Sequence, residues 1–141
     1  MGSELLAECS VLVVEDEPLI ALDVQSALAG AGATIISAGN TTDAVRLVAN
    51  TKLSAAVLDV DLGDLDCWVV CRLLARANVP FVFYTGYMQS EVFKDWPDAP
   101  VLAKPASHEQ IVAAVTRLLT AVRAPDGTSV SDGQEQMSGC G

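Results

Sequence analysis

The chain has 141 residues, which suits one domain, and 51% of them are hydrophobic, enough to bury a core. Eight Lys and Arg against 18 Asp and Glu give a formal net charge of −10, which repels phosphate backbones and argues against nucleic-acid binding. No apolar run reaches the roughly 20 residues that span a bilayer. The first ten residues also lack the basic region of a signal peptide. We therefore expect a cytoplasmic protein without membrane contact.

Short apolar runs alternate with helical patterns, which is typical of a parallel α/β sheet. The first half predicts a strand at 11–14, a helix from Pro18 to about Gly30, an edge strand at 34–38, a helix around 44–48, a strand at 55–58 and a helix over 68–74. The second half predicts a strand at 79–84, a weak helix over 88–96, a short strand at 101–103 and a helix over 111–122. Thr41 or Thr42 can cap the second helix, and Ser107 with Gln110 forms a capping box before the last.

The helical pattern stops after Ala124. Residues 124–141 contain no Lys, Arg or aromatic residue and are rich in Gly and Ser. Such a composition cannot bury enough apolar surface to fold, so it predicts a disordered C-terminal tail. The remaining unit, residues 8–123, is the predicted folded domain.

Four of the five expected strands end in polar residues. The first ends in Glu15-Asp16, the third in Asp59, the fourth in Thr85 and the fifth in Lys104. In a flavodoxin-like, doubly wound sheet of strand order 2-1-3-4-5, these four ends lie side by side, and ligands bind beyond the carboxyl ends of the strands. The sequence therefore predicts a single polar pocket at this edge.

Three carboxylates at close range raise each other's pKa unless a cation lies between them. Mg²⁺ is suited to this role, because it binds through one or two carboxylates, waters and a substrate phosphate. Lys104 and the Thr85 hydroxyl offer donors to phosphoryl oxygens, and Asp59 would be the nucleophile that forms an aspartyl phosphate. Each residue alone has an ordinary explanation as a helix cap, a turn or a solvated charge. Their joint placement favours the phosphoryl site.

The same residues carry a family resemblance. Glu15-Asp16, Leu58-Asp59, Thr85-Gly86 and Lys104-Pro105 resemble the receiver domains of bacterial response regulators, and the resemblance covers about residues 8–123. It implies a five-stranded parallel sheet with five helices. It also implies a domain that takes a phosphoryl group from a histidine kinase or phosphotransfer protein and signals through a downstream protein. Such a domain assists its own phosphorylation and dephosphorylation but is not an enzyme.

The resemblance also implies roles for individual residues. Asp59 would be the phosphoacceptor, with Thr85 and Lys104 contacting the phosphoryl oxygens. Mg²⁺ would be bound directly by Asp16 and Asp59, through water by Glu15, and by the backbone carbonyl of Asp61. The Lys104-Pro105 peptide bond is often cis in this family, which the low cis penalty before proline permits.

A subgroup of the family is more similar still. The segment from Pro80 to Tyr87 (PFVFYTGY) looks like the "FAT GUY" receivers, with Tyr84 where Ala is usual. These receivers occur in alphaproteobacteria, often with HWE-type histidine kinases. Most receivers carry an aromatic switch three residues before the lysine, but that position is Val101 here, so Tyr87 is the candidate switch. With no output domain visible in the sequence, we expect a stand-alone, single-domain response regulator.

Two alternatives remain open at this stage. Asp59-Val60-Asp61 resembles the nucleophile motif of haloacid-dehalogenase-type phosphatases, but that motif normally ends the first strand of its fold, and the chain lacks room for a cap domain. A pseudo-receiver, a binding module that no longer takes phosphate, is the other alternative. The intact set of acids, with Thr85 and Lys104, argues against it.

Overall fold

The computed structural model describes residues 5–60 and 67–123. Its five strands form one parallel sheet in the order β2-β1-β3-β4-β5, as the sequence predicts. The strands are β1 (Ser10–Val14), β2 (Thr34–Ala38), β3 (Ala55–Leu58), β4 (Phe81–Thr85) and β5 (Val101–Ala103). The predicted tail, residues 124–141, lies outside the described residues. The domain boundaries at 8 and 123 stay predictions.

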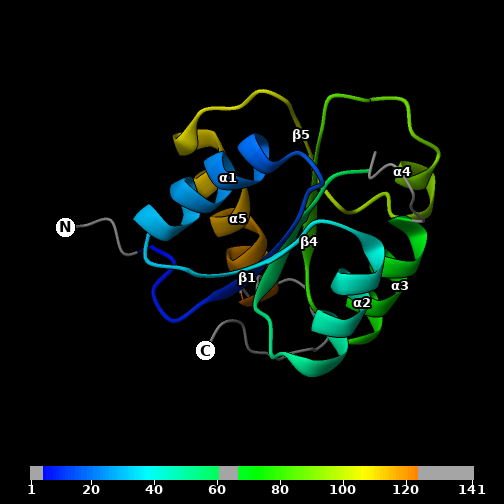
Figure 1. Cartoon of the computed structure of the whole chain (residues 1–141), viewed down its shortest axis with the longest axis horizontal. Coiled ribbons are helices and arrows are strands. Elements are labelled where there is room, and N and C mark those ends of the chain that lie inside the picture. Colours follow the sequence, from blue (N-terminus) through cyan, green and yellow to red (C-terminus); the bar gives the residue numbers. More distant parts are fainter. Residues whose placement is uncertain (1–4, 61–66, 124–141) are drawn as a thin grey trace.

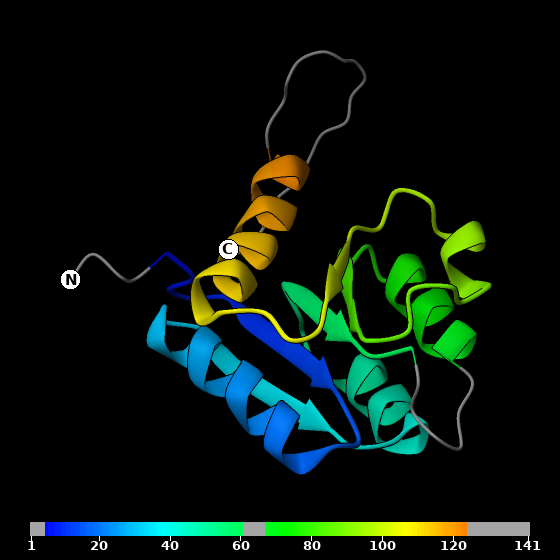
Figure 2. The same cartoon turned by 90° about the horizontal axis from the view of Figure 1, so that it is seen from above.

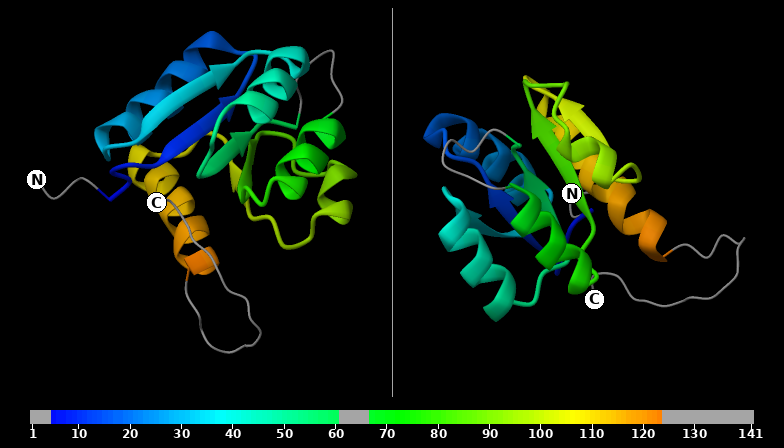
Figure 3. Two further views of the ribbon diagram at one scale, coloured as in Figure 1. Left: turned by 90° about the horizontal axis from the view of Figure 1, so that it is seen from below. Right: turned by 90° about the vertical axis from the view of Figure 1, so that its right-hand side faces the viewer.

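The helices cover the two faces of the sheet (Figure 1). They are α1 (Pro18–Gly30), α2 (Thr41–Asn50), α3 (Cys67–Arg76), α4 (Val92–Asp95) and α5 (His108–Arg123). Helices α1 and α5 pack against each other on one face. On the other face α2 packs against α3, and α4 lies beside α3 (Figure 3). Within the described ranges, no helix has the length and apolar character needed to cross a bilayer.

Burial on both faces explains the unbroken apolar runs of the central strands. Successive side chains of a strand point to opposite faces. In β1, Val11 and Val13 therefore join the core beneath α1 and α5, whereas Leu12 and Val14 join the core beneath α2 and α3. The more polar β2 has a single buried residue, Ala38, and forms one edge of the sheet, as expected.

Local signals were correct at some element ends and wrong at others. The capping box is confirmed: the Ser107 N–H donates to Gln110 Oε1 (2.8 Å), and the Gln110 N–H donates to Ser107 Oγ (3.1 Å). The expected cap of α2 at Thr41 or Thr42 is wrong. Asn40 is the N-cap, because its backbone is still extended while its Oδ1 accepts the Asp43 N–H at 2.8 Å.

Two elements are shorter than predicted. Strand β4 begins at Phe81 rather than at residue 79, because the Val79 N–H still bonds the Leu74 carbonyl at the end of α3 and Pro80 has no N–H to donate. The helix expected over 88–96 is reduced to α4, a single turn. Its start is marked by the Ser90 hydroxyl, which accepts the Val92 N–H at 3.2 Å.

Candidate functional site

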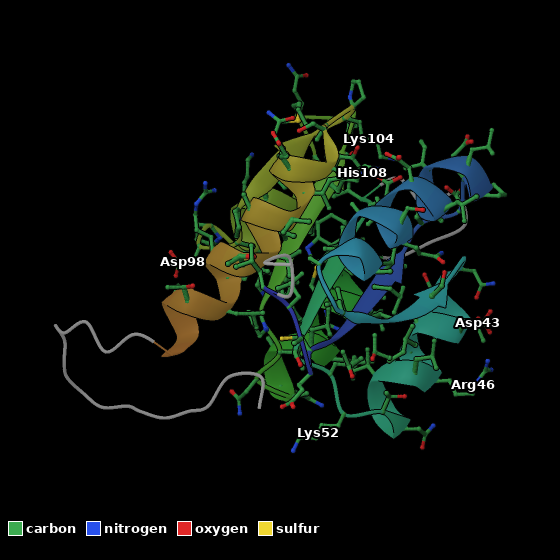
Figure 4. The ribbon with its side chains drawn as sticks, turned by 90° about the vertical axis from the view of Figure 1, so that its left-hand side faces the viewer. Asp43, Arg46, Lys52, Asp98, Lys104 and His108 are labelled. Atoms are coloured by element: carbon green, nitrogen blue, oxygen red, sulfur yellow. The ribbon has the colours of Figure 1, made fainter. Side chains whose placement is uncertain are left out.

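The carboxyl ends of β1, β3, β4 and β5 meet at one end of the sheet (Figure 2). Backbone hydrogen bonds continue past the last strand residues. The Asp59 N–H donates to the Val14 carbonyl (3.1 Å), and the Lys104 N–H donates to the Thr85 carbonyl (3.0 Å). The sheet itself thus fixes the backbone of three residues that the sequence singles out, Asp59, Thr85 and Lys104. Figure 4 shows Lys104 near the start of α5, at the opposite end of the molecule from Lys52, which precedes β3.

Three carboxylates converge in this region. Glu15 and Asp59 are each only 4% exposed, whereas Asp16 lies at the surface. One oxygen from each of the three lies within 4.8 Å of the others. This is the cluster expected from the sequence, with two buried acids and one exposed to solvent.

Lys104 joins the two buried acids. Its Nζ lies 2.8 Å from Glu15 Oε1 and 2.9 Å from Asp59 Oδ2, and its own side chain is only 16% exposed. The Lys104-Pro105 peptide bond is cis, as expected. Glu15 is further oriented by the Glu17 N–H, which donates to Glu15 Oε2 at 3.1 Å.

Burial and charge pairing act in opposite directions on the pKa values here. Burial raises the pKa of Glu15, and the hydrogen bonds from Lys104 and the Glu17 N–H offset that rise only in part. Burial alone would lower the pKa of Lys104, but its hydrogen bonds to Glu15 and Asp59 outweigh this effect, so the pKa is raised. Lys104 is therefore an ammonium ion at neutral pH. A further positive charge nearby would stabilise the ionised form of the Glu15 carboxyl group.

Thr85 and Tyr87 form the third side of the site. The Thr85 side chain is fully buried, and its Oγ1 accepts the Tyr87 N–H at 3.0 Å. A hydroxyl that accepts in this way keeps its own proton to donate. Tyr87 itself is 56% exposed at the rim. Val101, where most receivers have an aromatic residue, lies opposite Phe83 in the sheet and packs into the core beneath α3.

These groups open into a cavity of about 430 Å³. It is lined by Asp16, Glu17, Ile20, Asp59, Thr85, Gly86, Tyr87 and Lys104. The structure thus brings together Glu15, Asp16, Asp59, Thr85 and Lys104, with Tyr87 beside them. Asp61, expected as a fourth metal ligand, lies outside the described residues. The three clustered carboxylates suit a hard cation such as Mg²⁺, which takes oxygen ligands and retains waters that the cavity has room for.

One residue of the site was not anticipated. The Tyr84 side chain is buried next to Lys104, whose Nζ lies 5.7 Å from the centre of the tyrosine ring, and the Tyr84 hydroxyl accepts the Ala106 N–H at 3.0 Å. The sequence marked Tyr84 only as a departure from the subgroup's usual Ala. Tyr84 follows Phe83 in β4, and successive side chains of a strand point to opposite faces of the sheet. This alternation is the signal that could have placed Tyr84 on the face covered by α5.

Comparison with known proteins identifies the family. The family model for the response regulator receiver domain matches residues 11–116, most of the chain. The chain belongs to the response regulator receiver family. The assignment accords with the sheet order, with the placement of Asp16, Asp59, Thr85 and Lys104 around one cavity, and with Glu15 bonded to Lys104 behind them.

Individual relatives agree with this assignment. The receiver is 33% identical over 127 residues to the phyllosphere-induced regulator PhyR of Methylorubrum extorquens, a match that covers 84% of this chain and 47% of PhyR. The chain thus spans about half the length of this curated relative.

Two solved structures have the same fold. The signal receiver domain of a modulated diguanylate cyclase from Desulfovibrio desulfuricans superposes with a TM-score of 0.72 at 26% identity, covering 80% of this chain and 94% of that one. A Burkholderia pseudomallei response regulator structure, described as containing a phosphorylated aspartic acid, a calcium ion and citrate, gives a TM-score of 0.67 at 26% identity, covering 76% and 66% of the two chains.

The role of Lys104 as the counter-charge of the receiver site can be tested by Lys104→Met, measured without divalent cations. We expect the free energy of unfolding at neutral pH to fall by about 1–3 kcal/mol, because Glu15 and Asp59 would be left buried without a counter-charge. The stabilisation by Lys104 should be present from neutral pH up to its ordinary pKa and be lost as pH rises through its raised pKa. The deficit of the variant should shrink in acid, where Glu15 takes up a proton.

Lys94→Met is the matched control, because Lys94 pairs with Glu91 on the surface, where both side chains are more than 70% exposed. Urea unfolding of both variants measures the difference. Equal losses of stability in the two variants would contradict a special role for Lys104.

Proposed function

We propose that this receiver accepts a phosphoryl group on Asp59 from a histidine kinase or a phosphotransfer protein, in a reaction that requires Mg²⁺. The observation that carries the proposal is the position of Asp59. Its carboxylate is hydrogen-bonded to Lys104 Nζ at 2.9 Å, clusters with Glu15 and Asp16, and lines an open cavity. A structural ion pair would not need a cavity or the additional acids.

The chemical step is a displacement at phosphorus. An Asp59 carboxylate oxygen attacks the phosphoryl group, the new O–P bond forms, and the P–N bond to the donor histidine breaks, leaving its electron pair on the imidazole nitrogen. Lys104 is already oriented toward Asp59, and the buried Thr85 hydroxyl keeps a proton to donate. Both residues would donate to the phosphoryl oxygens, on which charge collects during transfer.

The metal would be held by Asp16 and Asp59 directly and by Glu15 through water, with the Asp61 carbonyl as a further ligand. Bound there, Mg²⁺ would neutralise charge on the acids and on the incoming phosphoryl group. The clustering of three carboxylate oxygens within 4.8 Å supports a cation at this position. The Burkholderia structure described as holding a phosphorylated aspartic acid and a calcium ion supports the same pairing of acceptor and metal.

The phosphorylated receiver would signal through contacts with a downstream protein, because a net charge of −10 makes nucleic acid an unfavourable partner. Its similarity to PhyR, named as a regulator, and its resemblance to the FAT GUY subgroup point to a histidine kinase of HWE type as one candidate donor. The cytoplasm is the compartment where we place this exchange. Receivers of this family are phosphoacceptors rather than enzymes, and Asp59 follows the third strand of the sheet, which disfavours a haloacid-dehalogenase-type phosphatase.

The acceptor can be tested by incubating the protein with acetyl phosphate and Mg²⁺ and measuring its intact mass. We expect one added phosphoryl group in the wild type and none in Asp59→Asn, because the amide is a poor nucleophile. Asp98→Asn, which changes an exposed aspartate outside the cavity, is the control and should be phosphorylated normally. A phosphoryl group that persists in Asp59→Asn would show that another residue is the acceptor.

Metal binding can be tested by thermal unfolding in increasing concentrations of Mg²⁺. At ten times the dissociation constant, Mg²⁺ should stabilise the wild type by about 1.4 kcal/mol, since it binds the folded state alone. Asp16→Asn should lose most of this gain, because an amide binds the ion less well than a carboxylate, while Asp98→Asn should keep it. If Asp16→Asn responds like the wild type, Asp16 is not a ligand.

We further propose that Tyr87 is the switch. Its N–H is bonded to Thr85 Oγ1, so a Thr85 hydroxyl that turns toward a phosphoryl group alters the Tyr87 backbone directly. The adjoining segment, residues 88–96, holds only the single turn of α4 and can rearrange at low cost.

The switch can be tested from amide NMR spectra recorded with and without beryllofluoride. The response of residues 88–96 should be strong in the wild type and reduced in Tyr87→Ala. Leu22→Ala, which removes another exposed apolar side chain, should behave like the wild type. Identical responses of residues 88–96 in the wild type and Tyr87→Ala would exclude Tyr87 as the switch.

A further inference from the structure

Tyr84 contacts the β5–α5 connection that carries Lys104 at two points. Its ring lies beneath the Lys104 ammonium, 5.7 Å from ring centre to Nζ, within the range of a cation–π interaction. Its hydroxyl accepts the N–H of Ala106, two residues after Lys104, at 3.0 Å. The ring is 3% exposed, so both contacts are made away from bulk solvent.

The position of Tyr84 in the sheet explains how one side chain reaches both groups. Tyr84 is paired with Leu102 of β5, and its side chain points to the face covered by α1 and α5. From there it extends past the end of β5 into the connection that leads to α5. An alanine at this position would reach neither the Lys104 ammonium nor the Ala106 N–H.

We propose that Tyr84 is a positioning residue that holds the Lys104 ammonium against Asp59. Tyr84 also connects Lys104 to the start of α5. This inference rests on the proposed phosphorylation of Asp59. The ring lies within cation–π range of the ammonium, which also bonds Glu15 and Asp59. The hydroxyl fixes Ala106, which precedes the capping box of Ser107 and Gln110. A change in the position of Lys104 on phosphorylation is thereby transmitted to the first turn of α5.

The test compares Tyr84→Phe, which keeps the ring and removes the hydroxyl, with Ser54→Ala. Ser54 is the matched control because its hydroxyl also accepts a backbone N–H, that of Ser10 at 3.0 Å, but at the opposite end of the sheet. Tyr84→Phe should slow phosphorylation by acetyl phosphate about fivefold, the loss of one buried hydrogen bond, and Ser54→Ala should not. Tyr84→Leu, which also removes the ring, should slow it further.

Two readouts separate positioning from a purely structural role. In a Lys104→Met background, Tyr84→Phe should have no additional effect on the rate, because Tyr84 would act through Lys104. In NMR spectra, Tyr84→Leu should shift the Lys104 side-chain methylene signals by removing the ring, and Tyr84→Phe should shift the Ala106 amide. Additive effects of the two substitutions on the rate, or unchanged Lys104 signals in Tyr84→Leu, would overturn the proposal.

The outcomes also distinguish this proposal from the one on which it rests. If the wild type takes up no phosphoryl group, the proposed function is wrong, and the NMR comparison still decides whether Tyr84 holds Lys104. If the wild type is phosphorylated on Asp59 and Tyr84→Phe reacts at the same rate, Tyr84 is only a core residue and the proposed function is unaffected.

Discussion

The site depends on one arrangement of charges: a single ammonium bonded to two buried carboxylates. Lys104 Nζ lies within 3 Å of both Glu15 and Asp59, and neither acid is more than 4% exposed. Burying two carboxylates is unfavourable unless each is paired. The lysine supplies one positive charge for two negative ones, and Asp16 adds a third negative charge at the surface. The site therefore retains excess negative charge, which a divalent cation would neutralise.

The sheet makes this arrangement possible without a dedicated scaffold. Glu15 follows β1, Asp59 follows β3 and Lys104 follows β5, and in a parallel sheet the carboxyl ends of these strands lie at the same edge. Backbone hydrogen bonds extend one residue past the strands and hold Asp59 and Lys104 in register. The rigid part of the site is thus an extension of the ladder. The segment from Tyr87 to the single turn of α4 holds little regular structure.

The neighbourhood of the lysine also differs from the usual pattern of the family. Val101 packs into the core and offers no aromatic ring to the site, while Tyr84 places a buried ring beneath Lys104. Tyr84, next to Lys104, and Tyr87, at the cavity, therefore both come from β4 and the loop after it. Tyr84 points to the face covered by α1 and α5, whereas Tyr87 is exposed at the rim of the cavity.

The sequence by itself determined the strand order, the positions of nearly all elements and the set of polar residues at the strand ends. The positions follow because buried parallel strands require unbroken apolar runs, and a polar residue after such a run marks the end of the strand. The strand order came from the flavodoxin-like pattern that the receiver resemblance implies. The sequence misplaced the cap of α2, where the choice depends on which side chain reaches a free N–H, and the start of β4, where the Val79 N–H still bonds the end of α3. It also made the helix over 88–96 longer than the single turn of α4. Only the tertiary structure decided that Lys104 bridges Glu15 and Asp59, and that Tyr84 reaches Ala106. Those contacts join residues 22 to 89 positions apart, and no local pattern along the chain records the distance between two side chains brought together by the packing of helices and sheet.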